Sequence, residues 1–154
     1  MAEIQMTLGW VIVYVDDPAE AARFYERTFG MRVDFIAGDE FAQLDTGTTK
    51  LGFASYPLSR SNFEGGVQKA EGRPFNVELA LVAQDIDAAF RIAVEAGCAP
   101  LAEPADKPQG QRVAYVRDPF GRCSSSPRRC RAATARRARS PRPPRAAARD
   151  SRRA

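Results

Sequence analysis

One unit of a strand followed by a capped helix occurs twice in this sequence, and this repeat limits the folds that the chain can adopt. Each copy has an apolar strand, an aspartate that can cap a helix, and a glycine that can close it. These are residues 10–15, Asp17 and Gly30 in the first copy, and residues 77–82, Asp85 and Gly97 in the second. Because strand, cap, helix and glycine coincide when the aspartates are aligned and one residue is deleted, we interpret the pattern as a duplicated supersecondary unit rather than two unrelated pairs.

The segments after each helix extend both copies into larger units. Three more strands are predicted at 31–37, 41–45 and 50–55, separated by glycine-containing turns. The second half continues with strands at 101–102 and 111–117, whereas the polar residues 56–73 predict a linker or mobile loop. Each half is therefore typical of a β-α-β-β-β module, and residues 1–121 form one α+β domain with modules at about 7–55 and 74–121. The first strand, WVIVYV, predicts burial on both faces.

The net charge of +4 combines two parts of opposite character. Residues 122–154 contain twelve arginines and one acid, Asp150, for a net charge of +11, while the other 121 residues carry 11 basic and 18 acidic side chains, for a net charge of −7. The last 33 residues contain no Leu, Val, Ile or aromatic residue. Such a segment cannot build an apolar core, so we predict a disordered tail after residue 121.

Histidine is absent from the chain, which excludes His-ligated zinc, Ser-His and Cys-His nucleophile pairs, and imidazole acid–base catalysis. The three cysteines form no CxxC pattern, and Cys98 is expected to pack as a small hydrophobic residue. The first residues lack a cationic signal region, and the apolar run at 8–15 is too short to cross a bilayer. We therefore expect a cytoplasmic protein.

Three stretches of the sequence resemble the vicinal oxygen chelate superfamily of glyoxalases, bleomycin-resistance proteins, fosfomycin-modifying enzymes and extradiol dioxygenases. They are VYVDDPAEAARFYERTFGM, LVAQDIDAAFRIAVEAG and KPQGQRVAYVRDPFG, the last with Gln109 where the family often has Trp. The resemblance covers residues 7–121. It implies paired βαβββ modules whose curved mixed sheets surround a shared cavity, a small-molecule ligand, and assembly as a homodimer.

The resemblance also implies where metal ligands would lie, on the first and last strands of each module. The matching positions are Trp10 and Gly52 in the first module and Glu78 in the second. Glu78 is the only one of the three that can ligate a metal, and one carboxylate is insufficient for a divalent cation. We therefore expect no metal and no cofactor, and catalytic residues remain unassigned.

The expected ligand-binding residues are Trp10, Tyr14, Phe53, Glu78 and Tyr115. Aromatic side chains in a cavity favour flat or apolar ligands. Two alternatives stay open, because Trp10 and Tyr14 can equally be core residues, and Glu78 can cap a strand edge in solvent. In a cavity, which the alternation of side chains favours, Glu78 would face a cationic ligand or pair with Arg112.

In the family, the DPFG stretch is followed by a last strand of the form hydrophobic-hydrophobic-Glu-Leu-x-Ser-Pro, which this chain lacks. Residues 122–128, RCSSSPR, permit the codons CGC TGC TCG AGC TCT CCC CGC. Reading from the third base gives CTG CTC GAG CTC TCC CCG, which encodes Leu-Leu-Glu-Leu-Ser-Pro. We therefore expect the last strand to be missing through a change of reading frame near Gly121 or Arg122. The alternative is an arginine-rich tail that binds nucleic acid non-specifically through phosphates.

The leading functional hypothesis is a metal-independent small-molecule-binding protein resembling the bleomycin-resistance branch. The acidic domain would suit a cationic ligand. The alternatives are a metal-dependent enzyme of the glyoxalase or dioxygenase type, and a frameshifted product without function. Activity as an enzyme is thus left uncertain, with binding favoured.

Overall fold

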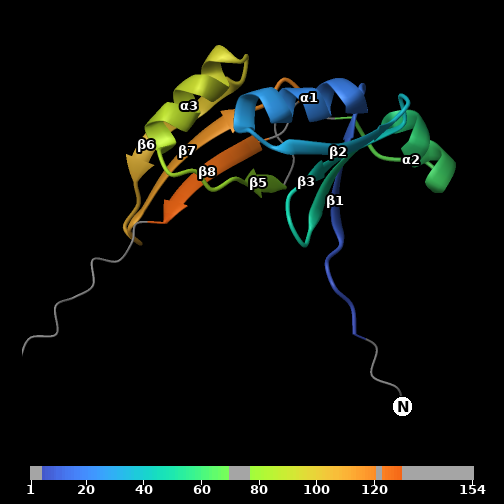
Figure 1. Ribbon diagram of the computed structural model, residues 1–154, viewed down its shortest axis with the longest axis horizontal. Coiled ribbons are helices and arrows are strands. Elements are labelled where there is room, and N and C mark those ends of the chain that lie inside the picture. Colours follow the sequence, from blue (N-terminus) through green and yellow to red (C-terminus); the bar gives the residue numbers. More distant parts are fainter. Residues whose placement is uncertain (1–4, 70–76, 121–122, 130–154) are drawn as a thin grey trace, which may run out of the picture.

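The computed structural model describes residues 5–69 and 77–120, and the backbone alone of residues 123–129. These residues form two four-stranded sheets with three helices, an α+β architecture (Figure 1). Sheet A has the strand order β1-β4-β3-β2, and sheet B has the order β5-β8-β7-β6. In sheet A and its helices, the bounds are β1 Trp10–Val15, α1 Pro18–Phe29, β2 Arg32–Ala37, β3 Phe41–Asp45, β4 Lys50–Ser55 and α2 Tyr56–Asn62. In sheet B, they are β5 Glu78–Ala80, α3 Ile86–Glu95, β6 Ala99–Asp106, β7 Gln111–Arg117 and β8 Cys123–Arg129.

The predicted duplication is confirmed by the topology of the two sheets. In each sheet, the strand before the long helix pairs in parallel with the last strand of its module, and the remaining pairings are antiparallel. The Asp17 carboxylate accepts a hydrogen bond from the Glu20 backbone N–H at 2.9 Å, and Asp85 does the same for Ala88 at 3.0 Å. The repeated aspartate therefore begins both helices by the same local chemistry.

The helix bounds follow the predicted caps more closely than the strand bounds follow the apolar runs. Gly30 ends α1 with a φ of 67°, in the left-handed region that glycine adopts without strain. The strand predicted at 77–82 is shorter in the structure, where β5 covers only three residues. The strand predicted at 101–102 is longer, because β6 runs over Ala99–Asp106. Main-chain pairing with β7 extends β6 over residues that carry no alternating pattern.

The prediction of a linker over residues 56–73 was wrong at its start, where α2 forms. The Ser55 hydroxyl accepts a hydrogen bond from the Leu58 backbone N–H at 3.3 Å, and Pro57 occupies the first turn. Serine before a helix and proline in its first turn are standard start signals, so the sequence did carry the information. Residues 70–73 of the predicted linker lie outside the described part of the chain.

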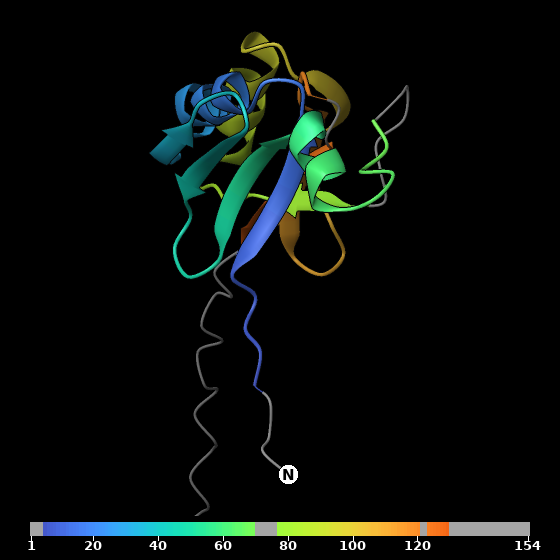
Figure 2. The same ribbon diagram turned by 90° about the vertical axis from the view of Figure 1, so that its right-hand side faces the viewer.

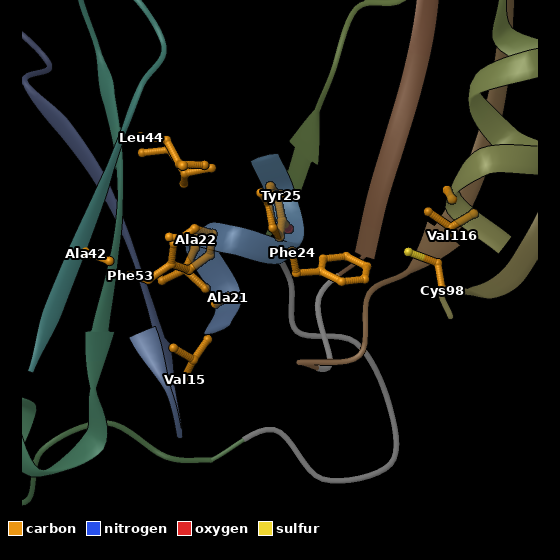
Figure 3. Close-up of a cluster of buried hydrophobic side chains, with 13 residues drawn as sticks. Val15, Ala21, Ala22, Phe24, Tyr25, Ala42, Leu44, Phe53, Cys98 and Val116 are labelled. Atoms are coloured by element: carbon orange, nitrogen blue, oxygen red, sulfur yellow. The ribbon is translucent and has the colours of Figure 1, made fainter. Parts of the chain in front are cut away.

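The joint between the two modules is built by α1. Phe24 and Tyr25 point from α1 into the space between sheet A and the second module, where Val116 and Cys98 lie (Figure 3). The Tyr25 hydroxyl donates a hydrogen bond of 2.7 Å to the Asp118 carboxylate, and the Phe24 and Phe120 rings meet edge to face at 5.6 Å. Two stretches far apart in the sequence, Phe24-Tyr25 and residues 118–120, are thus packed against each other between the modules. Cys98 is buried there, as predicted, and its burial raises the pKa of its thiol to about 11.

Strand β1 is not buried on both faces, contrary to the sequence prediction. It forms one edge of sheet A beside β4 (Figure 2). Val13 and Val15 are buried toward α1, but Trp10 and Ile12, on the other face, are exposed. The continuous apolar run reflects a sheet with a helix on one face and an apolar surface on the other.

The expected absence of the last strand was also wrong. Residues Cys123–Arg129 form β8, which pairs in parallel with β5 and antiparallel with β7. Main-chain hydrogen bonds can be made by any residue with a free N–H and C=O, so the pairing does not require the missing apolar side chains. The predicted disorder of the tail beyond this strand, at residues 130–154, lies outside the described residues. No helix in the described part of the chain is long and apolar enough to cross a membrane.

Candidate functional site

The face of sheet A that turns away from α1 presents a group of large apolar side chains. Successive strand residues point to opposite faces, so the register of the strands assigns each residue to one of them. Figure 1 shows both long helices on the upper side of the molecule, with the sheets diverging beneath them. We call the surface away from α1 the open face of sheet A. It comprises Trp10, Ile12, Tyr14, Asp34, Phe35, Phe41 and Gln43.

A chain of two hydrogen bonds crosses this face between three strands. The Trp10 indole N–H donates to Gln43 Oε1 at 2.7 Å, and Gln43 Nε2 donates to Asp34 Oδ2 at 2.7 Å. Gln43 is only 7% exposed, whereas the Trp10 side chain is 57% exposed. An indole has a single donor, and Gln43 uses it. Trp10 is therefore fixed in orientation and offers its ring face to solvent for stacking.

A glycine lies beneath the aromatic part of the open face. A Cβ atom at Gly52 would lie 2.7 Å from Phe41 Cζ, which is closer than real contacts allow. The absence of a side chain lets the Phe41 ring lie over β4, with the Phe35 ring 5.9 Å away, centroid to centroid. The face therefore has two neighbouring rings beside the Trp10–Gln43–Asp34 chain.

Charged groups lie at one end of the open face. The Asp45 carboxylate accepts hydrogen bonds from Lys50 and Arg32. These two cations, Lys50 first, lower the pKa of Asp45 to about 2. Among the described carboxyl groups with a resolved shift, the pKa moves downward, opposite to the direction that a general acid needs at neutral pH. The charged groups at this end of the face thus form ion pairs with one another.

Two of the predicted ligand-binding residues lie together on this face, and a third does not. Trp10 and Tyr14 are on the open face, four residues apart on β1. Phe53 was wrongly predicted to line the site. It is fully buried on the opposite face of sheet A, where its ring lies 5.0 Å from the Tyr25 ring. The alternation along β4 decides this, since Gly52 and Ala54 take the open face and Phe53 turns to α1.

The other two predicted residues lie on sheet B. Glu78 begins β5 and is exposed, and Tyr115 lies half-buried on β7. Tyr115 points away from the α3 side of sheet B, because its neighbours Ala114 and Val116 turn to α3. The structure therefore divides the predicted set between two sheets.

Arg112 does not provide the partner that the sequence suggested for Glu78. Its guanidinium donates two hydrogen bonds to the Asp87 carboxylate on α3, at 2.8 and 2.9 Å, and one to Asp106 at 3.2 Å. The bonds from Arg112 lower the pKa of Asp87, and the two carboxylates raise the pKa of Arg112. This cluster ties α3 to sheet B, and it lies on the side opposite Tyr115.

The residues at the metal-ligand positions implied by the resemblance do not fit a metal. Gly52 has no side chain, and the Trp10 indole can only donate. Glu78 is the single possible ligand among them. In the described ranges, no three Cys, Asp or Glu side chains come together in a group that could hold an ion.

A separate cavity of about 580 Å³ lies on the helix side of sheet B. It is half open to solvent and is bordered by the end of α1, Met31 before β2, Thr46 after β3, the connection from β5 to α3, α3 itself and β7. Its lining is mainly apolar and includes Phe29, Met31, Val82, Phe90, Ala114 and Val116. None of the five predicted ligand-binding residues lines it.

Sequence reasoning missed Asp34, Phe35 and Gln43 as members of the candidate site. Residues on β2 and β3 were treated only as strands, because their alternation does not say which face is covered by a helix. A β-bulge between Val33 and Phe35 changes the register of β2 and brings Asp34 to Gln43. A buried glutamine between two apolar residues, in FAQLD, was the one available signal.

The comparisons with known proteins agree with this architecture. The family model described as Glyoxalase/Bleomycin resistance protein/Dioxygenase superfamily matches residues 7–122. The chain belongs to this superfamily. No curated protein matches the chain significantly.

Solved structures with the same fold come from several bacteria. A glyoxalase-related enzyme from Fulvimarina pelagi is 20% identical, with a TM-score of 0.71 over 80% of this chain and 88% of that chain. TioX from Micromonospora sp. ML1 is 24% identical, with a TM-score of 0.59 over 81% and 100%. A lactoylglutathione lyase from Agrobacterium tumefaciens is 18% identical, with a TM-score of 0.61 over 82% and 96%. At these identities the likeness shows the shared fold alone.

Proposed function

We propose that this superfamily member is a metal-independent small-molecule-binding protein, resembling the bleomycin-resistance branch, which binds a flat aromatic cation on the open face of sheet A. The observation that carries the proposal is the exposed Trp10 ring, held in place by Gln43 beside the Phe35 and Phe41 rings. A fixed aromatic surface binds a flat ligand with little loss of side-chain freedom.

The Asp34 carboxylate and the negative net charge of the domain both favour a positively charged ligand. Asp34 is exposed and lies at the end of the hydrogen-bond chain, so its carboxylate can face a positive group on a ligand stacked against Trp10. Residues 1–121 carry a net charge of −7, which attracts cations to the domain. The proposal also includes a homodimer, as the family resemblance implies.

The experiment uses proflavine, a flat aromatic cation, titrated against the full chain. Trp10 is the single tryptophan of the chain, so its fluorescence reports directly on binding at this face. The arginine-rich residues 122–154 repel the probe, which reduces binding outside the domain. We expect saturable quenching of Trp10, and an anionic dye, anilinonaphthalene sulfonate, should not compete with proflavine.

Two phenylalanines of similar exposure provide a matched pair of variants. Phe35 on the open face is 46% exposed, and Phe63, which follows α2 and lies outside sheet A, is 48% exposed. Phe35→Ala should weaken proflavine binding about 2- to 10-fold, the range expected for loss of one aromatic contact. Phe63→Ala should leave the affinity unchanged, and equal effects of the two variants would reject the site.

A metal analysis separates this proposal from an enzyme of the glyoxalase or dioxygenase type. The dialysed protein should contain no stoichiometric divalent metal, and a chelator should leave the affinity for proflavine unchanged. A tightly bound metal at one ion per chain, with loss of binding after chelation, would overturn the metal-independent function.

A further inference from the structure

Strand β8 has a sequence that does not match its place in sheet B. It lies between β5 and β7 over residues 123–125, an interior position in the sheet. Interior strands favour β-branched and aromatic residues. The sequence of β8, CSSSPRR, contains no aliphatic or aromatic residue, although its partner β7 contributes the buried Val113, Ala114 and Val116.

The 580 Å³ cavity lies over the β7 residues that pair with two positions of β8. Position 124 pairs with Val116, and position 126 pairs with Ala114. Both of these β7 residues line the cavity, opposite Ala89 and Ala93 of α3. The space opens to solvent, since its lining residues Val82 and Ile92 are 74% and 49% exposed, and it leaves the α3 side of β7 without the close packing that is normal between a helix and its sheet.

We propose that this cavity is the space of two leucine side chains, at positions 124 and 126, which another reading frame of the same nucleotides encodes. The residues Arg122 to Arg128 permit codons that, read from the third base of the first, give Leu-Leu-Glu-Leu-Ser-Pro. Each codon of the other frame shares two of its three bases with one codon of the present frame. Assigning each residue to that codon places the six residues at positions 123 to 128. The leucines at 124 and 126 then pair with the two cavity-lining residues of β7.

The register provides a check that does not depend on the cavity volume. The glutamate of the other frame falls at position 125, which pairs with Tyr115. Tyr115 lies on the face of sheet B away from α3, so the glutamate takes that face, together with the first leucine of the frame at position 123, and the leucines at 124 and 126 take the helix face. The apolar–polar alternation of a half-buried strand is thus restored over positions 124 to 126.

The composition of the following residues agrees with the same change of frame. From position 122 onward the chain has twelve arginines and no Leu, Val, Ile or aromatic residue, after a domain in which such residues are frequent. One shift near codon 121 or 122 accounts both for this change and for the unfilled space beneath α3. The shift lies either in the gene or in its determined nucleotide sequence.

The packing part of the proposal is tested on the full chain by adding the leucines alone. The variant Ser124→Leu/Ser126→Leu should raise the Tm by on the order of 10 °C, because two buried leucines replace cavity. It should also reduce fluorescence of anilinonaphthalene sulfonate, used here as a probe of accessible apolar surface. The matched control Ser125→Leu adds the same side chain on the other face and should not raise the Tm.

Each result decides the question. A Tm of the double variant equal to that of the parent chain, or a rise as large in the control, would show that the cavity is not a site for these leucines. The nucleotide sequence of codons 118–130 tests the frame itself. Codons that cannot regroup to Leu-Leu-Glu-Leu overturn the frame assignment, and codons that do regroup support it.

Discussion

The hydrogen bond between Tyr25 and Asp118 is the most direct test of how the two modules are held together. Both residues are almost fully buried, at 0% and 3% exposed, and the hydroxyl donates to the carboxylate at 2.7 Å across a sequence separation of 93 residues. The Phe120 backbone N–H donates to the other carboxylate oxygen at 3.0 Å. Tyr25→Phe removes the hydroxyl alone and keeps the ring contacts with Phe29 and Phe53.

The expected loss can be worked out from the chemistry of the pair. A hydrogen bond to a charged group contributes about 1.5–3 kcal/mol, and its removal leaves the Asp118 carboxylate with one donor fewer in the interior. The free energy of unfolding of the Tyr25→Phe variant should fall by that amount. For a domain of this size, the same loss lowers the Tm by roughly 5–12 °C.

Urea denaturation followed by circular dichroism measures the effect, and a double-mutant cycle isolates it. Tyr25→Phe, Asp118→Asn and the double variant should be non-additive, with a coupling energy above about 1 kcal/mol. Tyr115→Phe is the control, because that tyrosine lies half-buried outside the joint, and its effect should stay within about 0.5 kcal/mol. A Tyr25→Phe variant as stable as the parent, or additive effects in the cycle, would refute the role of this bond.

Three further predictions concern single residues. Gly52→Ala should cost about 1–3 kcal/mol in urea denaturation by forcing the Phe41 ring aside, whereas Gly9→Ala, with open space around it, should not; equal stabilities would contradict the close approach. Because the folded pKa of Asp45, about 2, lies below its ordinary value of 3.8, its ion pairs stabilise the fold above pH 3.8 and are lost as the pH falls toward 2. The stability difference between the parent and Asp45→Asn should therefore shrink over this range in urea titrations at stepped pH, and a constant difference would disprove the assignment. With its other cysteines changed to serine, the folded chain should alkylate at Cys98 roughly 100-fold more slowly than a free thiol at pH 8, since its pKa is about 11, and similar rates before and after unfolding would rule out burial.

The helices and most strands could be predicted because local chemistry determines them. Asp17 and Asp85 cap their helices through contacts within three residues, so the caps are visible in the sequence. The strands at 10–15, 41–45, 50–55 and 111–117 match their predicted bounds, since each is an apolar run between turn residues. The strand β5 was predicted too long because its bounds depend on pairing with β8, whereas α2 was missed although Ser55 and Pro57 carry local start signals.

The candidate site could be predicted only in part, because a strand residue belongs to it only if its side chain lies on the face of sheet A that α1 does not cover. Trp10 and Tyr14 were identified from an aromatic strand, but Phe53 has the same composition signal and belongs to the core. The neighbouring Gly52 was read only as a position that cannot ligate a metal, whereas its packing function beneath Phe41 comes from a contact between strands.

By itself, the sequence determined that the domain is duplicated, that its charge changes sign after residue 121, and that histidine chemistry is excluded. Those properties follow from residue identity and from contacts along a single turn of chain. The tertiary structure decided that Trp10, Gln43 and Asp34 form one hydrogen-bonded surface, that Phe24-Tyr25 meets residues 118–120, and that positions 124 and 126 pair with the residues lining a cavity. Register and the side covered by each helix are set by packing between distant segments, so no local pattern could have supplied them.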